Sequence, residues 1–112
     1  MAVSPEVAAR MLSALESVRP ITSRKMFGGV GVYCDGTFFA VIDDDRLFFK
    51  WGPSNEALFD EVGAEQWFIP QGPMPYREVP ESILQDQDRL GEWIDAAVDV
   101  AQTKKAKKPK SQ

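Results

Sequence analysis

Apolar residues recur at helical spacing near both ends of the chain. Residues 4–18 predict a first helix that buries one stripe, formed by Val7, Met11, Leu15 and Val18. Residues 86–101 predict a last helix with a longer stripe, formed by Leu90, Trp93, Ile94, Ala97, Val98 and Ala101. A short helix through about Val62 is expected between them, with Gly63 as its left-handed stop.

Between the first two predicted helices, apolar residues are denser and suggest strands. Residues 23–51 predict three strands in a meander, a run ending in VGVYC followed by TFFAVI and RLFFKW. Asp35-Gly36 favours a tight type I′ turn, and Asp43–Asp45 marks the next turn. Two more strands are predicted in EQWFI and MPYREV. Pro75 removes a ladder donor from the last strand, which should therefore lie at an edge or be irregular.

The resulting order is α-β(3)-α-β(2)-α, without an internal repeat. Because the meander connections are short, its strands must pair antiparallel. We therefore expect an α+β fold, a two-layer sandwich with a mostly antiparallel five-stranded sheet and helices on one face. The length of 112 residues suits one domain. We assign residues 1–101 to this domain and residues 102–112 to a flexible lysine-rich tail.

The turns also predict which side chains share a face of the meander. One face is uncharged and is expected to be the core, with Gly29, Gly31, Tyr33, Phe38, Ala40, Ile42, Leu47, Phe49 and Trp51. The apolar centre of the other face comprises Val30, Val32, Phe39, Val41 and Phe48. Since exposed apolar patches often mark contact sites, these five residues are the candidate surface for a protein partner or a second copy. Alternatively another segment covers this face, or the assignment of the faces is inverted.

Composition excludes several chemistries. The sequence has no histidine and one cysteine, Cys34, so it lacks Ser-His-Asp and Cys-His catalysis, histidine-containing zinc sites and an intrachain disulfide. All 17 acidic residues lie within residues 1–101, which hold eight of the 13 basic residues. This acidic body repels phosphate backbones. The five lysines from Lys104 to Lys110 would support at most weak, non-specific contact with nucleic acid.

The most unusual stretch is RKMFGGVG, residues 24–31. Its glycines would let backbone amides approach an anion, and the candidate ligand-binding residues are Arg24, Lys25, Gly28 and Gly29. No P-loop or complete dinucleotide-binding pattern follows, so structural glycines at a strand bend are the alternative. The acidic run at 43–45 lacks the spacing of a calcium loop. We predict no metal site, cofactor or catalytic residue.

The stretch RKMFGGVGVYCDGTFFAVIDDDRLFFKW resembles the TfoX N-terminal domain family, also called Sxy, of bacterial competence regulators. The resemblance covers about residues 10–101 and includes MPYREVP and the last predicted helix. It implies an α-β(3)-α-β(2)-α fold similar to secretion-chaperone-like domains, in a cytoplasmic regulatory protein without a known enzymatic activity or cofactor. The full-length regulators act as coactivators of competence genes. They continue into a helical domain where this sequence has its lysine tail.

These observations favour a non-catalytic regulatory module that works by protein–protein contact. No apolar run is long enough to cross a membrane, and the N-terminus is unlike a secretory signal, so we expect a cytoplasmic location without a membrane partner. One alternative is a small anionic-ligand binder or enzyme that uses residues 24–31. The other is a weak nucleic-acid accessory protein that uses the lysine tail.

Overall fold

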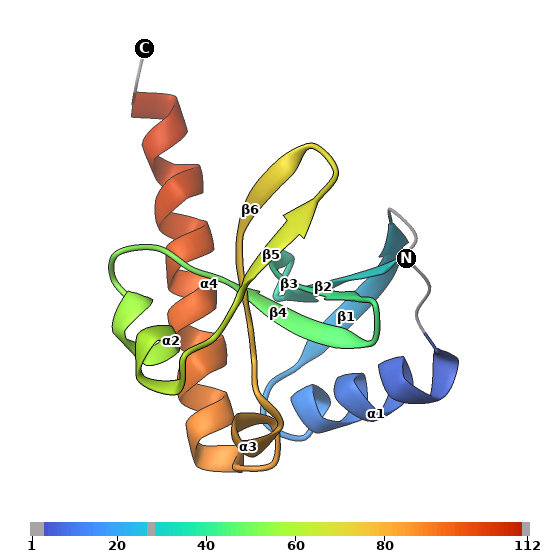
Figure 1. The fold of residues 1–112 in the computed structure, drawn as a ribbon. Coiled ribbons are helices and arrows are strands. Elements are labelled where there is room, and N and C mark those ends of the chain that lie inside the picture. The colour runs from blue at the N-terminus through green and yellow to red at the C-terminus, as the bar shows by residue number, and fades with distance from the viewer. Residues whose placement is uncertain (1–3, 27–28, 111–112) are drawn as a thin grey trace.

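The computed structural model describes residues 4–26 and 29–110, with side chains described up to residue 103. The fold is α+β, as predicted (Figure 1). Its helices are α1 (Pro5–Glu16), α2 (Glu56–Val62), α3 (Glu81–Leu84) and α4 (Gln87–Lys110). Its strands are β1 (Ile21–Met26), β2 (Gly29–Cys34), β3 (Thr37–Asp43), β4 (Arg46–Lys50), β5 (Gln66–Ile69) and β6 (Gly72–Glu78).

The strands form one antiparallel sheet in the order β1-β2-β3-β4-β6-β5. The sheet has six strands, so the prediction of five is wrong by one. The first predicted strand is a hairpin, in which Met26 of β1 pairs with Gly29 of β2. The sequence pattern missed β1 because residues 22–25 are polar and exposed, and they show no apolar alternation.

Two further strand predictions can be compared with the sheet. β6 lies between β4 and β5, so the edge position suggested by Pro75 is wrong, but the pairing of β6 is irregular as expected. The ladder between β4 and β6 spans three pairs and ends at Lys50 with Tyr76. Pro75 follows just beyond, where its carbonyl accepts from the amide of Trp51 at 3.1 Å. A proline is tolerated there because it is not required as a donor to β4.

Both tight turns of the central strands form as the sequence indicates. Asp35 and Gly36 have φ values of 50° and 80°, which are the positive angles that a two-residue type I′ turn requires. Asp44 and Asp45 adopt φ values of 55° and 59° in the next hairpin. Aspartate tolerates this left-handed region better than most residues, so the acidic run serves as a turn.

A bulge in β3 changes the predicted assignment of faces. Cys34 pairs with Thr37 as expected, but the register then shifts, so that Val32 pairs with Ala40 instead of Phe39. The extra residue reverses the inward and outward alternation of β2 relative to the later part of β3. The predicted core face is therefore correct for β4 and the second half of β3, and wrong for Phe38 and for the β2 residues Gly29, Gly31 and Tyr33, because Val30, Val32 and Cys34 face the main core instead.

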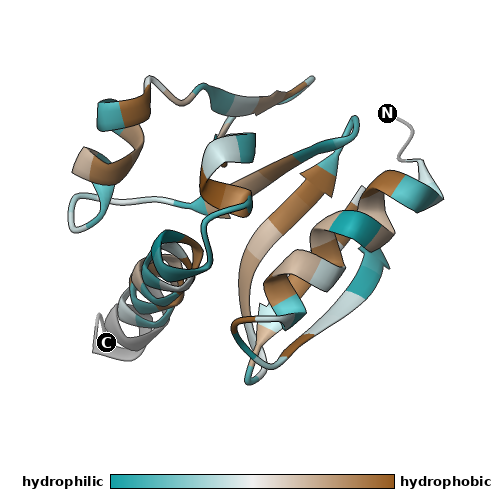
Figure 2. Ribbon diagram, turned by 90° about the horizontal axis from the view of Figure 1, so that it is seen from below, coloured by the Kyte–Doolittle hydropathy of each residue, from teal (hydrophilic) through white to brown (hydrophobic). Residues whose placement is uncertain are grey.

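The main core lies between the sheet and the helices. Figure 2 shows α1 and α4 on the same side of the central strands. Helix residues Leu15, Trp93 and Ile94 meet strand residues Phe39 and Phe49 in this core. The stripes predicted for the two long helices face it as expected, because their buried positions include Met11, Leu15, Leu90 and Ala97.

A second, smaller cluster occupies the opposite face of the sheet. It consists of Val41, Phe48, Trp67 and Tyr76, with Phe38, Ile69 and Met74 packed against it. The β5–β6 hairpin supplies one half of this cluster, and β3 and β4 supply the other. Phe48 stacks on Trp67 with ring centroids 5.7 Å apart, and Trp67 meets Tyr76 edge-on at 5.8 Å. We call these seven residues the hairpin cluster.

The last helix extends farther than its apolar stripe. The prediction ended it at Ala101, whereas α4 runs to Lys110. The Asp86 carboxylate accepts from the amide of Arg89 at 3.2 Å and so caps its first turn, as expected. The boundary at residue 101 and the flexibility of the lysine-rich segment stay predictions.

Candidate functional site

The five residues predicted as an interaction surface are not exposed together. Phe39 is 0% exposed and Phe48 is 2% exposed, and Val32 and Val41 are also buried. Val32 and Phe39 belong to the main core, with Val30 partly buried against it, whereas Val41 and Phe48 belong to the hairpin cluster. The predicted exposed patch is therefore wrong, because helices cover one part and the β5–β6 hairpin covers the other.

An apolar groove opens next to the hairpin cluster. Its volume is about 530 Å³, within the range of protein binding sites. The residues that line it come from β3, β5, β6 and the turn between the last two, namely Phe38, Val41, Asp43, Trp67, Phe68, Ile69, Pro70, Gln71, Met74 and Tyr76. We call this the aromatic groove. It combines apolar walls with few polar groups, the usual pattern of a recognition site.

Phe68 makes the rim of this groove unusual. Its side chain is 65% exposed, and it is the one exposed large hydrophobic side chain among residues 4–26 and 29–103. Its neighbours Trp67 and Ile69 pack into the hairpin cluster instead. Residues 67–69 of β5 nevertheless all line the groove.

The charges around the aromatic groove are arranged unevenly. Asp43 is the one charged residue among the described residues of its lining, and its Oδ2 accepts from Trp67 Nε1 at 3.1 Å. A neighbouring hollow of about 510 Å³ shares Asp43, Trp67 and Phe68, and its further charged residues are Asp44, Glu65 and one cation, Arg46. The β5 side of the groove is therefore acidic.

Arg46 is held in place beside this acidic rim. Its guanidinium donates to Glu78 Oε1 at 2.7 Å and to Glu65 Oε1 at 2.8 Å. The hydrogen bond to Glu78 is the main cause that raises the pKa of Arg46, and the bond to Glu65 adds to it. Two carboxylates thus share one cation, which leaves the rim with a surplus of negative charge.

The opposite end of the groove face carries aromatic rings with cations over them. Lys50 Nζ lies 5.2 Å from the centroid of the Tyr76 ring, and the Arg24 guanidinium lies 5.9 Å from that of Tyr33. Burial is the main cause that raises the pKa of Tyr76 to about 12, with a smaller effect from Tyr33. Tyr76 is therefore a neutral packing group at physiological pH.

The described residues of the glycine-rich stretch 24–31 belong to β1 and β2, and their role in the sheet is structural. A Cβ on Gly29 would lie 2.4 Å from the carbonyl oxygen of Ile42, so backbone already fills the space that an anion would need. Arg24 and Lys25 are successive residues of β1 and point to opposite faces of the strand. Gly28 lies outside the described residues. The structural role weighed in the sequence analysis accounts for Gly29.

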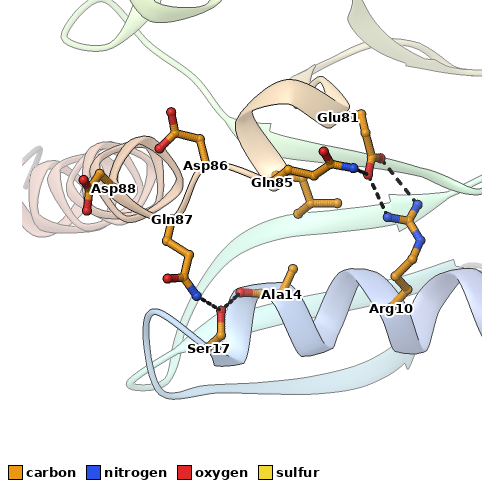
Figure 3. Close-up of a pocket in the computed structure, with 9 residues that line it drawn as sticks. Arg10, Ala14, Ser17, Glu81, Gln85, Asp86, Gln87 and Asp88 are labelled. Carbon is orange, nitrogen blue, oxygen red and sulfur yellow. Dashed lines mark hydrogen bonds and ion pairs between the residues drawn. The ribbon is translucent and has the colours of Figure 1, made fainter.

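A second depression, between α1 and the α3–α4 corner, is polar (Figure 3). Its volume is about 820 Å³. Arg10 donates to Glu81 at 2.9 Å, and this bond is the main cause that lowers the pKa of Glu81. Gln87 Nε2 donates to Ser17 Oγ at 3.3 Å across the same depression. These side chains pair with one another, so the contacts brace α1 against α3 and α4.

Metal-binding and thiol chemistry have little basis in the described part of the chain. Among those residues, no group of three or more His, Cys, Asp or Glu side chains is placed to hold a metal ion. The thiol of Cys34 is buried, and burial raises its pKa, which disfavours the reactive thiolate. None of the helices searched is long and apolar enough to span a membrane.

Sequence reasoning did not bring the residues of the aromatic groove together. Trp67 and Tyr76 were treated as parts of separate strands, and Phe68 was not singled out. The alternation of Trp67 with Ile69, and of Met74 with Tyr76, was the available signal for a second apolar face. The sequence pattern did not indicate that β6 pairs with β4. This pairing brings the apolar face of the β5–β6 hairpin next to Val41 and Phe48.

Comparisons with known proteins give a consistent result. Residues 13–101 match the family described as the TfoX N-terminal domain. Over 58 residues the chain is 31% identical to the DNA transformation protein TfoX1 of Aliivibrio fischeri. That alignment covers 52% of this chain and 28% of the relative, so the similarity concerns a minor part of the longer protein.

Proposed function

The chain belongs to the TfoX N-terminal domain family, and from this premise we propose that it is a competence-related regulatory module that binds another protein through the aromatic groove. The name of the relative, a DNA transformation protein, supports the link to competence. In this proposal the domain works in the cytoplasm and catalyses no reaction, as the family resemblance implies.

The exposure of Phe68 beside the aromatic groove is the observation that supports the contact mechanism. A large apolar side chain that is 65% exposed costs hydration free energy, which a partner would recover by covering it. Full burial of a phenylalanine is worth about 2 kcal/mol, or roughly 30-fold in affinity. Aromatic side chains in such positions often dominate the energetics of an interface.

A complementation experiment tests this proposal. The gene is deleted in the native host and replaced by the wild type, by Phe68→Asp or by the matched control Ala57→Asp, which adds the same charge at an exposed position of α2. Transformation frequency is measured for each strain. We expect Phe68→Asp to behave like the deletion and Ala57→Asp like the wild type, while circular dichroism shows both variants folded.

Two results would contradict the proposal in different ways. If the deletion leaves the transformation frequency unchanged, the link to competence is wrong. If Phe68→Asp restores the frequency fully, the aromatic groove is not the contact surface, whatever role the domain has in competence.

A further inference from the structure

We propose that the aromatic groove receives an extended, basic and apolar segment of a partner protein, which pairs with the free edge of β5 as an additional strand. The inference rests on the proposed function and specifies the chemistry of the partner. A large apolar residue of the segment would pack on Phe68 and Trp67. A nearby lysine or arginine would lie at the acidic rim that Asp43, Asp44 and Glu65 form.

The two edges of the sheet differ in how well they are protected. β1, at one edge, has exposed residues that include Arg24 and Lys25, and such charges discourage pairing with another chain. β5, at the other edge, has β6 as its one neighbour among the described strands and reads QWFI, without a charge or a proline (Figure 1). Its free edge therefore offers backbone donors and acceptors to a further strand.

The groove borders this strand. Residues 67–71, from β5 and the turn after it, line the groove consecutively, and residues of β3 and β6 line the rest of it. A strand added beside β5 would place alternate side chains in that space and on Phe68.

Charge complementarity specifies a basic segment. Asp43 lies in the lining, Asp44 lies beside it, and the charge of Glu65 and Glu78 is only half balanced by Arg46. A lysine or arginine in the partner would be attracted to this rim, and like-charge contact would disfavour an acidic segment.

Selection from a random dodecapeptide library displayed on phage, with the full chain as bait, provides the test. We expect enrichment of peptides that combine lysine or arginine with aromatic or aliphatic residues. Synthetic versions are then titrated by calorimetry against the wild type, Asp43→Asn and the control Asp44→Asn. Asparagine can still accept from Trp67 Nε1, so Asp43→Asn should fold and weaken binding about three- to tenfold. Asp44→Asn should weaken it less than about twofold.

Backbone methylation of the selected peptides tests strand addition without altering the protein. Each amide nitrogen in turn is methylated, which removes one ladder donor. Loss of affinity at every second position supports pairing with β5, because the donors of a strand face the two sides alternately. Loss without this period, absence of any enriched peptide, or binding unaffected by Asp43→Asn would overturn the inference. A dimer of the chain that Phe68→Asp dissociates would also overturn it, in favour of a second copy.

The outcomes separate this inference from the proposed function. If Phe68→Asp abolishes transformation but the peptides show no two-residue period, the function stands and the strand-addition inference fails. If the peptides add as strands but Phe68→Asp transforms normally, the inference stands and the proposed function fails.

Discussion

Gly29 and Gly31 of β2 allow the effect of a backbone clash on stability to be compared with that of a side-chain clash. A Cβ on Gly29 would lie 2.4 Å from the carbonyl oxygen of Ile42, which the sheet holds in place. A Cβ on Gly31 would lie 2.6 Å from Met26 Cε, at the flexible end of a side chain. The same substitution to alanine should therefore give different stabilities at the two positions.

The magnitude follows from the distances. Real Cβ atoms essentially never approach a neighbour closer than 3.0 Å, so Gly29→Ala must move β2 or β3 by more than half an ångström. Overpacking that moves backbone costs about 1–3 kcal/mol. Alanine recovers up to about 1 kcal/mol in the conformational entropy of the unfolded chain. We expect a net loss of about 1–2 kcal/mol for Gly29→Ala, and a smaller loss, below about 1 kcal/mol, for Gly31→Ala.

Urea unfolding followed by tryptophan fluorescence measures both values. A loss of about 2 kcal/mol also corresponds to a drop of roughly 10 °C in Tm for a domain of this size. Met26→Ala provides a control, because it should remove most of the cost of Gly31→Ala, leaving the contact with Phe38 Cε1 at 3.1 Å, and leave the cost of Gly29→Ala unchanged. If Gly29→Ala is as stable as the wild type, or less damaging than Gly31→Ala, the reasoning from backbone contact is refuted.

Two further predictions concern polar contacts that hold the fold. Asn55 is buried and bonds to the amide of Gly52 at 2.8 Å and to the carbonyl of Lys50 at 3.1 Å, so Asn55→Ala should cost about 2 kcal/mol in urea unfolding; an unchanged midpoint would contradict it. Hydrogen bonding by Arg19 lowers the pKa of the Asp95 carboxyl in the folded chain. The pair therefore stabilises the fold at pH values above the pKa that this carboxyl has in the unfolded chain. The stabilisation is lost as the pH falls through the lowered pKa of the folded chain. Asp95→Asn should therefore flatten the acid side of the stability profile by less than about 1 kcal/mol, since both side chains are partly exposed, and an unaltered slope would count against it.

The sequence was most informative where one local rule determined the structure. The stripes of the first and last helices follow from the helical period, and both face the main core. The positive φ values of Asp35 and Gly36 follow from the needs of a two-residue turn. Gly63 ends α2 with a φ of 65°, as its lack of a Cβ allows.

The errors occurred where the structure depends on contacts distant in the sequence. The bulge next to Phe39 leaves no mark in a run that begins Thr37-Phe38-Phe39, yet it decides which face each side chain joins. β1 is recognisable only through its pairing with β2, because its own residues are polar. The aromatic groove requires Val41 and Trp67 to meet, and only the ladder between β4 and β6 brings them together.

The hairpin cluster divides the sheet into two parts that differ in how readily they unfold. β5 and β6 join the remaining strands through the three-pair ladder to β4, and their apolar residues belong to a cluster separate from the one that the helices cover. Detachment of this hairpin would remove the contacts of Arg77 with Trp51 and Phe59 but leave the packing of α1 and α4 on the sheet, so we expect it to be a subglobal unfolding unit. A ligand bound to β5 would then oppose local opening of the hairpin more than global unfolding. Amide hydrogen exchange in β5 and β6 would therefore be slower in the bound domain than in the free domain.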